Sequence, residues 1–233
     1  MKLLCFDTTA KTATAAVVTE GKILAESSVT IGLTHSQTLM PLTDGMLKAA
    51  GITLSDIDLV AVSHGPGSFT GVRIGVSTIK GLAFSTGKPC VGVSSLASLA
   101  KNLEGLDGLR VPVMDARRQQ VYTAIYNKEG NCVFGDSLIP LSALCDELAK
   151  SDEPIWLAGD GYLLAHRFIS GDERLVIRLK STPPALLLHN AASAALLAEE
   201  IFRAGKCSTD SELRPVYLRD SQAERERKEK LNK

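Results

Sequence analysis

The sequence predicts an α/β fold built from two successive halves, each with a mixed five-stranded sheet flanked by helices. Short apolar runs alternate along the chain with segments whose apolar residues recur at helical spacing. Both halves show one order of elements: three strands, helix, strand, helix, strand, helix. An Asp ends the first strand of each half, Asp7 in one and Asp115 in the other. We expect the halves to cover residues 1–104 and 105–233, each starting with an antiparallel meander that crossovers extend.

The first half begins with three apolar or alternating runs that suit the meander. Its strands are expected at 2–7, 14–19, 22–29, 57–63 and 89–93. Its helices are expected at about 35–50, at about 70–86, and from 94 or 95 to about 103. The first two of these helices end before Gly51 and Gly87, because glycine is the usual residue just past a helix end.

The start of the first helix carries two further signals. Thr34 followed by Gln37 fits a capping box, in which each side chain bonds to the backbone of the other residue. Pro41 lies inside the apolar pattern of the helix. Since proline has no N–H, we expect it to bend the helix or to delay its start.

The second half repeats the order of elements without repeating the sequence. Its strands are expected at 111–116, 121–127, 132–140, 155–159 and 175–179, and its helices at 142–150, 162–169 and 185–204. The tail, 219–233, has opposite charges four residues apart and is expected to be a solvated helix or a frayed end.

Composition limits the class of protein. The chain has 233 residues, with 26 Lys and Arg against 26 Asp and Glu, so it lacks the net positive charge that draws independent binders to nucleic acid. If RNA is a substrate, we therefore expect a partner to hold it. The five cysteines show no C-x-x-C pair, which is typical of reduced thiols, and no run reaches the ~20 apolar residues of a membrane helix. We expect a cytoplasmic protein without a membrane association.

A glycine-rich loop, Gly65-Pro66-Gly67-Ser68-Phe69-Thr70-Gly71, follows a strand and opens a helix. Free N–H groups at a helix start suit an anion, so this segment is either a ligand loop or a tight turn with a Ser or Thr cap. It is not a Walker A loop, since no Gly-Lys-Ser/Thr follows at the required spacing. Pro66 occupies the first glycine position of a Gly-x-Ser-x-Gly hydrolase motif, so Ser68 does not match a nucleophile.

Several motifs together resemble one protein family. GPGSFTGVRIG followed by KGLA, then PCVGVSSL, DARRQQVY and a late PVYLR resemble the TsaB (YeaZ) family, which serves synthesis of threonylcarbamoyladenosine beside the tRNA anticodon. The resemblance runs from Phe6 to Arg219. The duplicated order of elements also resembles the actin, sugar-kinase and Hsp70 (ASKHA) superfamily, which implies two ribonuclease-H-like halves with a nucleotide site between them.

The family resemblance implies a non-catalytic member of a pair. Its paralogue TsaD carries an Asn-His-x-x-Gly-His metal motif just after a Gly-Val, and here the two histidine positions fall on Ser95 and Leu99. Leucine has no lone pair, and a neutral hydroxyl is a poor ligand for a transition metal. The four histidines show no helical i,i+3 or i,i+4 pairing: His35, His64, His166 and His189. We therefore expect no metal, no catalytic residue and no cofactor.

The resemblance further implies that the helices at 35–50 and 70–86 bind TsaD, that the pair helps to recruit the ATPase TsaE, and that the chain alone forms a two-fold dimer through the same surface. The residues expected at this interface lie on these two helices: His35, Leu39, Leu42, Met46, Arg73, Val76 and Lys80.

A vestigial nucleotide cleft is also expected. In the superfamily, the hairpin after strand one receives phosphates and a late loop receives adenosine, which here implies Asp7, Thr8, Thr9, Asp115, Gly159 and Asp160. The turn after Asp7 has no glycine, and each Cβ limits how closely a phosphate approaches the backbone. Asp7 and Asp115 either hold magnesium through water or cap turns at strand ends.

Two other functions remain open from the sequence. A small-molecule kinase of the same superfamily is compatible with the order of elements and with Asp7 and Asp115, and binding of Mg-ATP distinguishes it. A peptidase is the second, but it needs a nucleophile with a base, or a metal pair, and the sequence shows neither arrangement.

Overall fold

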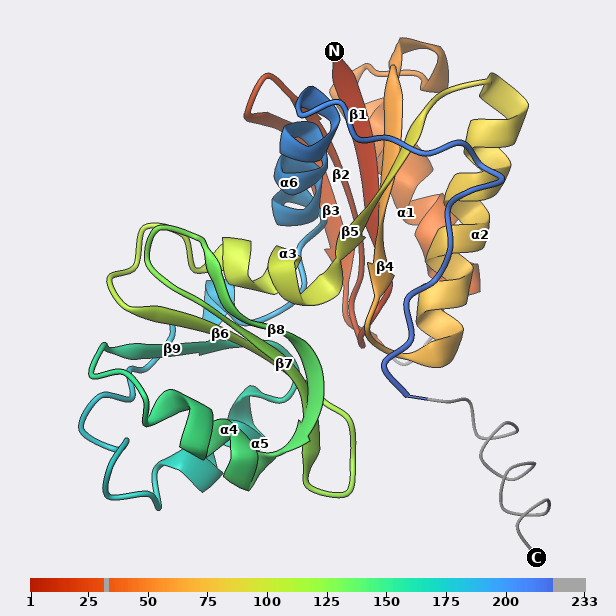
Figure 1. Ribbon diagram of the computed structural model, residues 1–233. Helices are drawn as coiled ribbons and strands as arrows, with labels where there is room; N and C mark the ends of the chain where they lie inside the picture. The colour runs from red at the N-terminus through yellow and green to blue at the C-terminus, as the bar shows by residue number, and fades with distance from the viewer. Residues whose placement is uncertain (32–33, 220–233) are drawn as a thin grey trace, which may run out of the picture.

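The structure is a computed structural model that describes residues 1–31 and 34–219, and within this part of the chain two mixed sheets lie in separate halves (Figure 1). The first sheet has the order β3-β2-β1-β4-β5, from Lys22–Val29, Ala13–Thr19, Lys2–Asp7, Leu59–Gly65 and Cys90–Ser94. The second has the order β8-β7-β6-β9, from Cys132–Pro140, Gln120–Tyr126, Leu109–Asp115 and Ile155–Ala158. In each sheet the first strand pairs antiparallel with the second and parallel with the fourth, which confirms a meander extended by crossovers.

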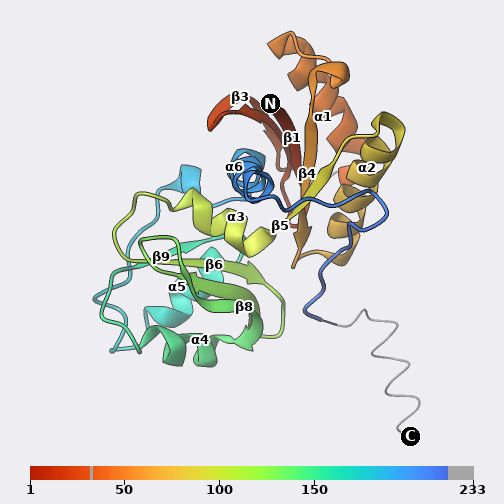
Figure 2. The ribbon, with the colours of Figure 1, turned by 45° about the horizontal axis from the view of Figure 1, so that its top comes forward.

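The first sheet is covered on both faces. Helices α1 (His35–Ala50) and α2 (Phe69–Thr86) lie on one face, and their core includes Phe6, Val62 and Ile79. Helix α6 (Ala191–Arg203) lies on the other face (Figure 2). Because neither face of the sheet meets water, the side chains of β1 are apolar on both faces. The run LLCF therefore replaces the alternating pattern of a strand with one exposed face.

Helix α6 follows the second half in sequence but packs on the first sheet. Apart from Glu199, its buried side chains are alanines, including Ala194, Ala195 and Ala198, which contact Leu3, Cys5 and other residues of the central strands. Small side chains let the helix axis approach the sheet closely. After α6, residues 204–219, here called the C-terminal strap, run back past β5 and α2 (Figure 1).

Helix α3 (Ser95–Asn102) packs between the halves, against α6 on one side and the second sheet on the other (Figure 2). Its Leu96 and Leu99 join Met114 and Ala124 in a shared core. The other face of the second sheet is covered by α4 (Leu141–Leu148) and α5 (Tyr162–Ile169). The halves therefore stack as helices, sheet, helices, sheet, helices.

The strand predicted at 175–179 does not form, so the second sheet has four strands within the described residues instead of five. Asp172 accepts the N–H of Arg174 on its side chain and the N–H groups of Leu175 and Val176 on its carbonyl, which starts a run of turns. Local side-chain bonds to the backbone compete with a sheet ladder, and here they prevail. Only Leu179 keeps an isolated parallel bridge, to Ile155.

Two helix starts also differ from the prediction. The last helix begins at Ala191 instead of 185, because the Asn190 side chain caps it by accepting the N–H groups of Ala192 and Ser193. At α1, the Thr34 side chain makes no cap and donates to Gln37 Oε1 at 3.1 Å, so the predicted capping box is wrong. Pro41 lies inside α1, which begins at His35, so the proline does not delay the start.

Helix ends follow the glycine signal. Gly51 and Gly87 both adopt the left-handed conformation just after α1 and α2. The longest helix, α2, has 18 residues, and within the described part of the chain none is both long and apolar enough to cross a membrane. The predicted tail at 219–233 lies outside the described residues apart from Arg219.

Candidate functional site

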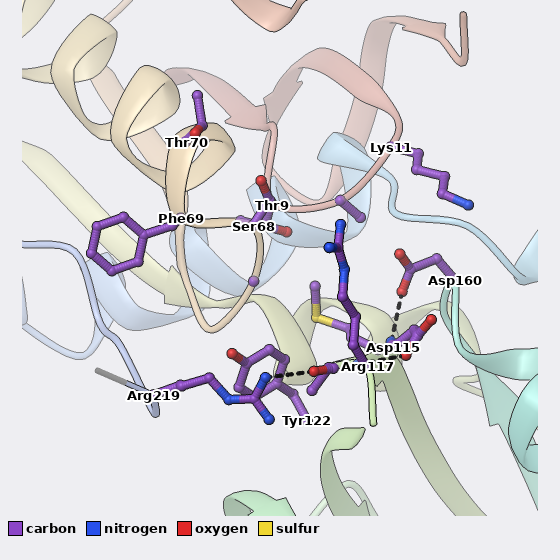
Figure 3. A pocket seen from close by; sticks show the side chains of 14 residues that line it. Thr9, Lys11, Ser68, Phe69, Thr70, Asp115, Arg117, Tyr122, Asp160 and Arg219 are labelled. Carbon is purple, nitrogen blue, oxygen red and sulfur yellow. Dashed lines mark hydrogen bonds between the residues drawn. The ribbon is translucent and has the colours of Figure 1, made fainter. Parts of the chain in front are cut away.

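A polar cavity of about 740 Å³ lies where loops of the two halves meet, and it is here called the central cleft (Figure 3). The first half contributes the turn after β1 and the glycine-rich loop before α2. The second half contributes the end of β6 and the loop after β9, and the strap contributes its last described residue. Charged or polar side chains that line it are Thr9, Lys11, Ser68, Thr70, Asp115, Arg117, Tyr122, Asp160 and Arg219.

The turn after β1 is fixed by its own side chains. Asp7 is fully buried, and its Oδ1 accepts the backbone N–H of Thr9 at 2.9 Å and the Thr9 hydroxyl at 2.7 Å. Thr8 donates its hydroxyl to the carbonyl of Gly71 at 2.8 Å. Asp7 Oδ2 has no hydrogen-bond partner among the described residues. Asp7 thus caps a turn at a strand end, and Asp7 and Thr8 do not line the cleft, whereas Thr9 does.

The glycine-rich loop packs against this turn. A Cβ at Gly67 would lie 2.4 Å from the Thr9 carbonyl oxygen, and one at Gly71 would lie 2.0 Å from that of Thr8. The N–H of Ser68, which an anion would need, donates to Thr9 at 2.7 Å, and the Ser68 hydroxyl caps α2 by accepting the N–H of Gly71 at 3.3 Å. The glycines therefore permit close backbone packing, and the tight-turn interpretation explains the motif.

The corresponding turn of the second half is more open. Asp115 is exposed and its Oδ1 accepts the N–H of Arg117 at 2.7 Å, while Asp160 Oδ1 accepts the N–H of Asp115 at 3.2 Å. Arg117, Arg118 and Gln119 have φ of +63°, +54° and +58°, a left-handed run that side-chain-bearing residues rarely adopt. In Figure 3 the Arg117 side chain points from this turn toward the Ser68 loop.

Gly159 packs against β6 and does not line the cleft. Its φ is +120°, and a Cβ there would lie 2.1 Å from the Val113 carbonyl oxygen, so a side chain has no room. The structure thus brings Thr9, Asp115 and Asp160 to one cavity and leaves Asp7, Thr8 and Gly159 behind its walls.

Six of the polar residues that line the cleft were not singled out as site residues from the sequence: Lys11, Ser68, Thr70, Arg117, Tyr122 and Arg219. Arg219 donates to the carbonyl of Ala116 at 2.6 Å and also to the Gln120 side chain, so the strap is fastened to the turn that holds Arg117 (Figure 3). Tyr122 lines the cleft from β7. The late PVYLR motif marked Arg219 in the sequence but did not indicate what this side chain contacts.

The residues predicted for a partner interface fall into two groups. Leu39, Met46 and Val76 are only 1%, 6% and 2% exposed and lie in the core beneath α1 and α2. Leu42 is half-buried against the same core. The apolar stripe of each helix faces its own sheet, because burying that stripe is what holds the helix in place. For these side chains the structure corrects the predicted surface position.

The polar members of that set lie closer to the surface. His35 Nε2 is 2.7 Å from the Ala10 carbonyl oxygen, which ties the start of α1 to the first turn. Lys80 donates to the Leu213 carbonyl in the strap at 3.3 Å. Arg73 is exposed, donates to the Tyr217 hydroxyl at 3.0 Å, and lies 4.2 Å over the Phe69 ring. Phe69 and Tyr217 stack at 4.2 Å, so this cation–π group anchors the strap to α2.

The residues at the expected metal positions are buried on α3. Ser95 and Leu99 are both fully inaccessible, and Ser95 Oγ has no described hydrogen-bond partner. Within residues 1–31 and 34–219 no three His, Cys, Asp or Glu side chains gather closely enough to hold a metal ion.

Burial lowers the pKa of His64, although a backbone hydrogen bond at Arg214 opposes that shift.

Comparisons with known proteins agree on one group. The family model described as TsaD, tRNA N6-adenosine threonylcarbamoyltransferase, matches residues 31–227. The tRNA threonylcarbamoyladenosine biosynthesis protein TsaB of Bacillus subtilis is 36% identical over 68% of this chain and 71% of its own length. The TsaB of Escherichia coli is 28% identical over 96% of both chains.

A solved structure of a similar protein has the same fold as this chain. A Pseudomonas aeruginosa protein, described as uncharacterized with similarity to peptidase YeaZ, superposes with a TM-score of 0.76. It is 28% identical, and the match covers 94% of this chain and 99% of that one. The halves therefore have the same arrangement in both proteins.

Proposed function

The chain belongs to the TsaB (YeaZ) family, and from that premise we propose that it is a non-catalytic subunit that binds and activates TsaD. It acts in tRNA threonylcarbamoyladenosine biosynthesis, as its relatives do by name. In this proposal TsaD carries the metal and performs the transfer, the chain helps to recruit the ATPase TsaE, and tRNA is contacted only through the assembly. The same surface forms a homodimer when TsaD is absent, and the assembly works in the cytoplasm.

The observation that carries the non-catalytic role is the pair of positions on α3. Ser95 and Leu99, which stand where TsaD is expected to have histidines, are both fully buried, and Leu99 packs in the core shared by the two halves. Leu99 has no donor atom, and the Ser95 hydroxyl is sealed from the central cleft. A metal at this place would need ligands that these two residues do not supply.

The interaction surface is best assigned to the outer faces of α1 and α2. Since Leu39, Met46 and Val76 are buried in the core, the residues free for a partner are among those that the helices expose, including Met40, Asp44, Ser77, Gly81 and Phe84. Phe84 is 78% exposed and Met40 40%, so apolar area is present on both helices. Gly81 has nothing within 4 Å of its Cβ position, which leaves room for a partner helix.

The test places charge and bulk at the centre of this surface. We expect Ser77→Arg to fold normally, because Ser77 is exposed, and to weaken TsaD binding at least about tenfold, since a charge is buried without a partner. Titration calorimetry with purified TsaD measures the affinity, and tRNA modification by the pair measures activation.

The matched control is Leu163→Arg on α5, where Leu163 is 79% exposed in the other half. This variant should bind TsaD like the unmodified chain. Full activity of TsaD without this chain would contradict the subunit role, and equal binding by both variants would contradict the choice of surface.

We propose that the central cleft is a vestige of a nucleotide site. Support comes from the glycine-rich loop, whose Ser68 N–H is already bonded to Thr9, and from the bulky turn that follows Asp7. Isothermal titration of the isolated chain with Mg-ATP should show no tight binding and no turnover. Tight binding with phosphoryl transfer to a small molecule would favour the kinase alternative instead.

A further inference from the structure

A second cavity, of about 210 Å³, lies apart from the central cleft. Its walls come from α3 and α6 and from β6, β7 and the turn after β7. Figure 2 shows α3 beside α6 and next to β6. No residue of the first cleft contributes to it. It is smaller than the roughly 300 Å³ at which drug-sized sites begin, which suits a ligand of few atoms.

The base of this cavity is a buried arginine. Arg110 on β6 is 6% exposed and lies beside Tyr126 of the neighbouring strand. Its Nη2 donates to the Lys128 carbonyl, whereas Nε has no acceptor among residues 1–31 and 34–219. In the same part of the chain no carboxylate lies within salt-bridge distance of its guanidinium.

An unpaired buried guanidinium is unusual because it stays charged at all physiological pH values. Burying a charge is unfavourable unless an opposite charge or several hydrogen bonds compensate it. Among the described residues Arg110 has one carbonyl acceptor and no carboxylate partner, and it lines a cavity, so the missing opposite charge is an anion that enters from solvent.

The rim of the cavity has the opposite sign. Glu104, Glu129 and Glu200 are exposed there, and Lys101 bonds to Glu104 at 2.9 Å and to Glu200 at 3.0 Å. One lysine for three carboxylates leaves the rim negative. A free phosphate would be repelled on entry, whereas a ligand with an anionic and a cationic end fits both charges.

The remaining walls are apolar. Ala97, Ala100 and Leu197 line the cavity from α3 and α6, together with Tyr126 of β7. The three aliphatic side chains suit a short aliphatic group of a ligand.

We propose that this cavity binds a free α-amino acid with a short aliphatic side chain. The carboxylate accepts hydrogen bonds from Arg110, the ammonium group faces Glu129 and Glu200, and the side chain packs against Ala97 and Leu197. Binding joins α3, α6 and the second sheet, so the ligand stabilises the contact between the halves. The site is separate from the proposed TsaD surface on α1 and α2.

The experiment uses the full chain and three probes: L-valine, isobutyrate, which lacks the ammonium group, and inorganic phosphate. Calorimetric titration and thermal unfolding are measured for each. We expect saturable binding of L-valine with a raised Tm, binding of isobutyrate weaker by about tenfold, and no binding of phosphate. Absence of L-valine binding at millimolar concentration, or equal binding of isobutyrate or phosphate, overturns the proposal.

Two variants separate binding from folding. Arg110→Gln should abolish binding of L-valine, but it also removes the bond to Lys128. Glu129→Gln lies in an exposed turn, so it should leave the Tm of the unliganded chain unchanged and weaken L-valine several-fold. Glu173→Gln, at an exposed position that does not line the cavity, is the matched control and should bind normally. Unchanged affinity in Glu129→Gln overturns the placement of the ammonium group.

Discussion

Thr8 and Thr9 show how single backbone atoms can determine a motif. Their carbonyl oxygens lie 2.0 Å and 2.4 Å from where the Cβ atoms of residues 71 and 67 would be. Any side chain at those two positions would have to displace the turn after β1. The glycines are therefore explained by contact, and the loop needs no bound ligand to account for them.

Gly71→Ala should destabilise the protein by roughly 1–3 kcal/mol, because its Cβ meets the Thr8 carbonyl in a packed region that cannot relax freely. Gly81→Ala on the same helix is the control. Its Cβ has open space, so replacing a flexible residue inside a helix should stabilise by roughly 0.5–1 kcal/mol. Urea unfolding measures both, and equal effects would contradict the packing explanation.

His64 makes stability depend on pH. Burial lowers its pKa in the folded protein below the ordinary value of 6.5, so the unfolded chain binds more protons between those two values. Its contribution to stability is present above pH 6.5 and is lost as the pH falls through the lower, folded pKa.

The free energy of unfolding of His64→Gln should therefore decrease less between pH 7 and pH 5 than that of the unmodified protein. Gly92 lies against the His64 ring, and a Cβ at residue 92 would lie 2.3 Å from Nδ1. A glutamine at residue 64 therefore has to occupy the narrow space that the flat imidazole ring fills. The comparison of slopes, rather than of absolute stability, removes that packing effect. Parallel pH profiles for the two proteins would refute the assignment.

At the level of elements, the C-terminal strap connects parts that are far apart in the sequence. It pairs with β5 through Ser208 and Cys90, stacks Tyr217 on Phe69 of α2, and ends with Arg219 on the turn after β6. These contacts are isolated and separated along the strap, whereas a strand in a sheet is held by a continuous ladder of hydrogen bonds. Such a segment opens locally more easily than the core.

Tyr217→Ala should speed amide hydrogen exchange of residues 208–219 about fivefold, since an aromatic pair contributes roughly 1 kcal/mol. The control is Tyr217→Phe, which keeps the stack with Phe69 and loses only the hydroxyl that accepts from Arg73. It should exchange nearly as slowly as the unmodified chain. If both variants behave alike, the hydrogen bond and not the stack holds the strap.

For the whole molecule, the sequence was sufficient to predict what depends on periodicity and on local signals. The order of elements, the two meanders and the helix ends at Gly51 and Gly87 follow from such patterns. The predictions that were wrong failed because of tertiary packing or side-chain hydrogen bonds, which periodicity does not show. The strand at 175–179 was lost to the Asp172 turn, and the apolar positions of α1 were placed on a surface because periodicity gives a stripe without saying what covers it.

The site was less predictable than the fold. Thr9, Asp115 and Asp160 converge because two similar turns face each other, and the repeated Asp was the signal for that. Arg219 and Arg110 could not be identified as partners of a cleft and of a cavity. Their roles depend on which loops the tertiary fold brings next to them. A single sequence does not show which distant segments come together.

The position of α6 has a consequence for how the protein is made. The face of the first sheet formed by Leu3, Cys5 and Val91 is closed by residues of α6, among them Ala194 and Ala198, which follow the whole second sheet in sequence. On the ribosome, that face waits uncovered until α6 has emerged. Until then the nascent chain presents an apolar surface on which it can aggregate or bind chaperones, and a premature stop codon before α6 leaves the first sheet unfinished although all of its strands have been made.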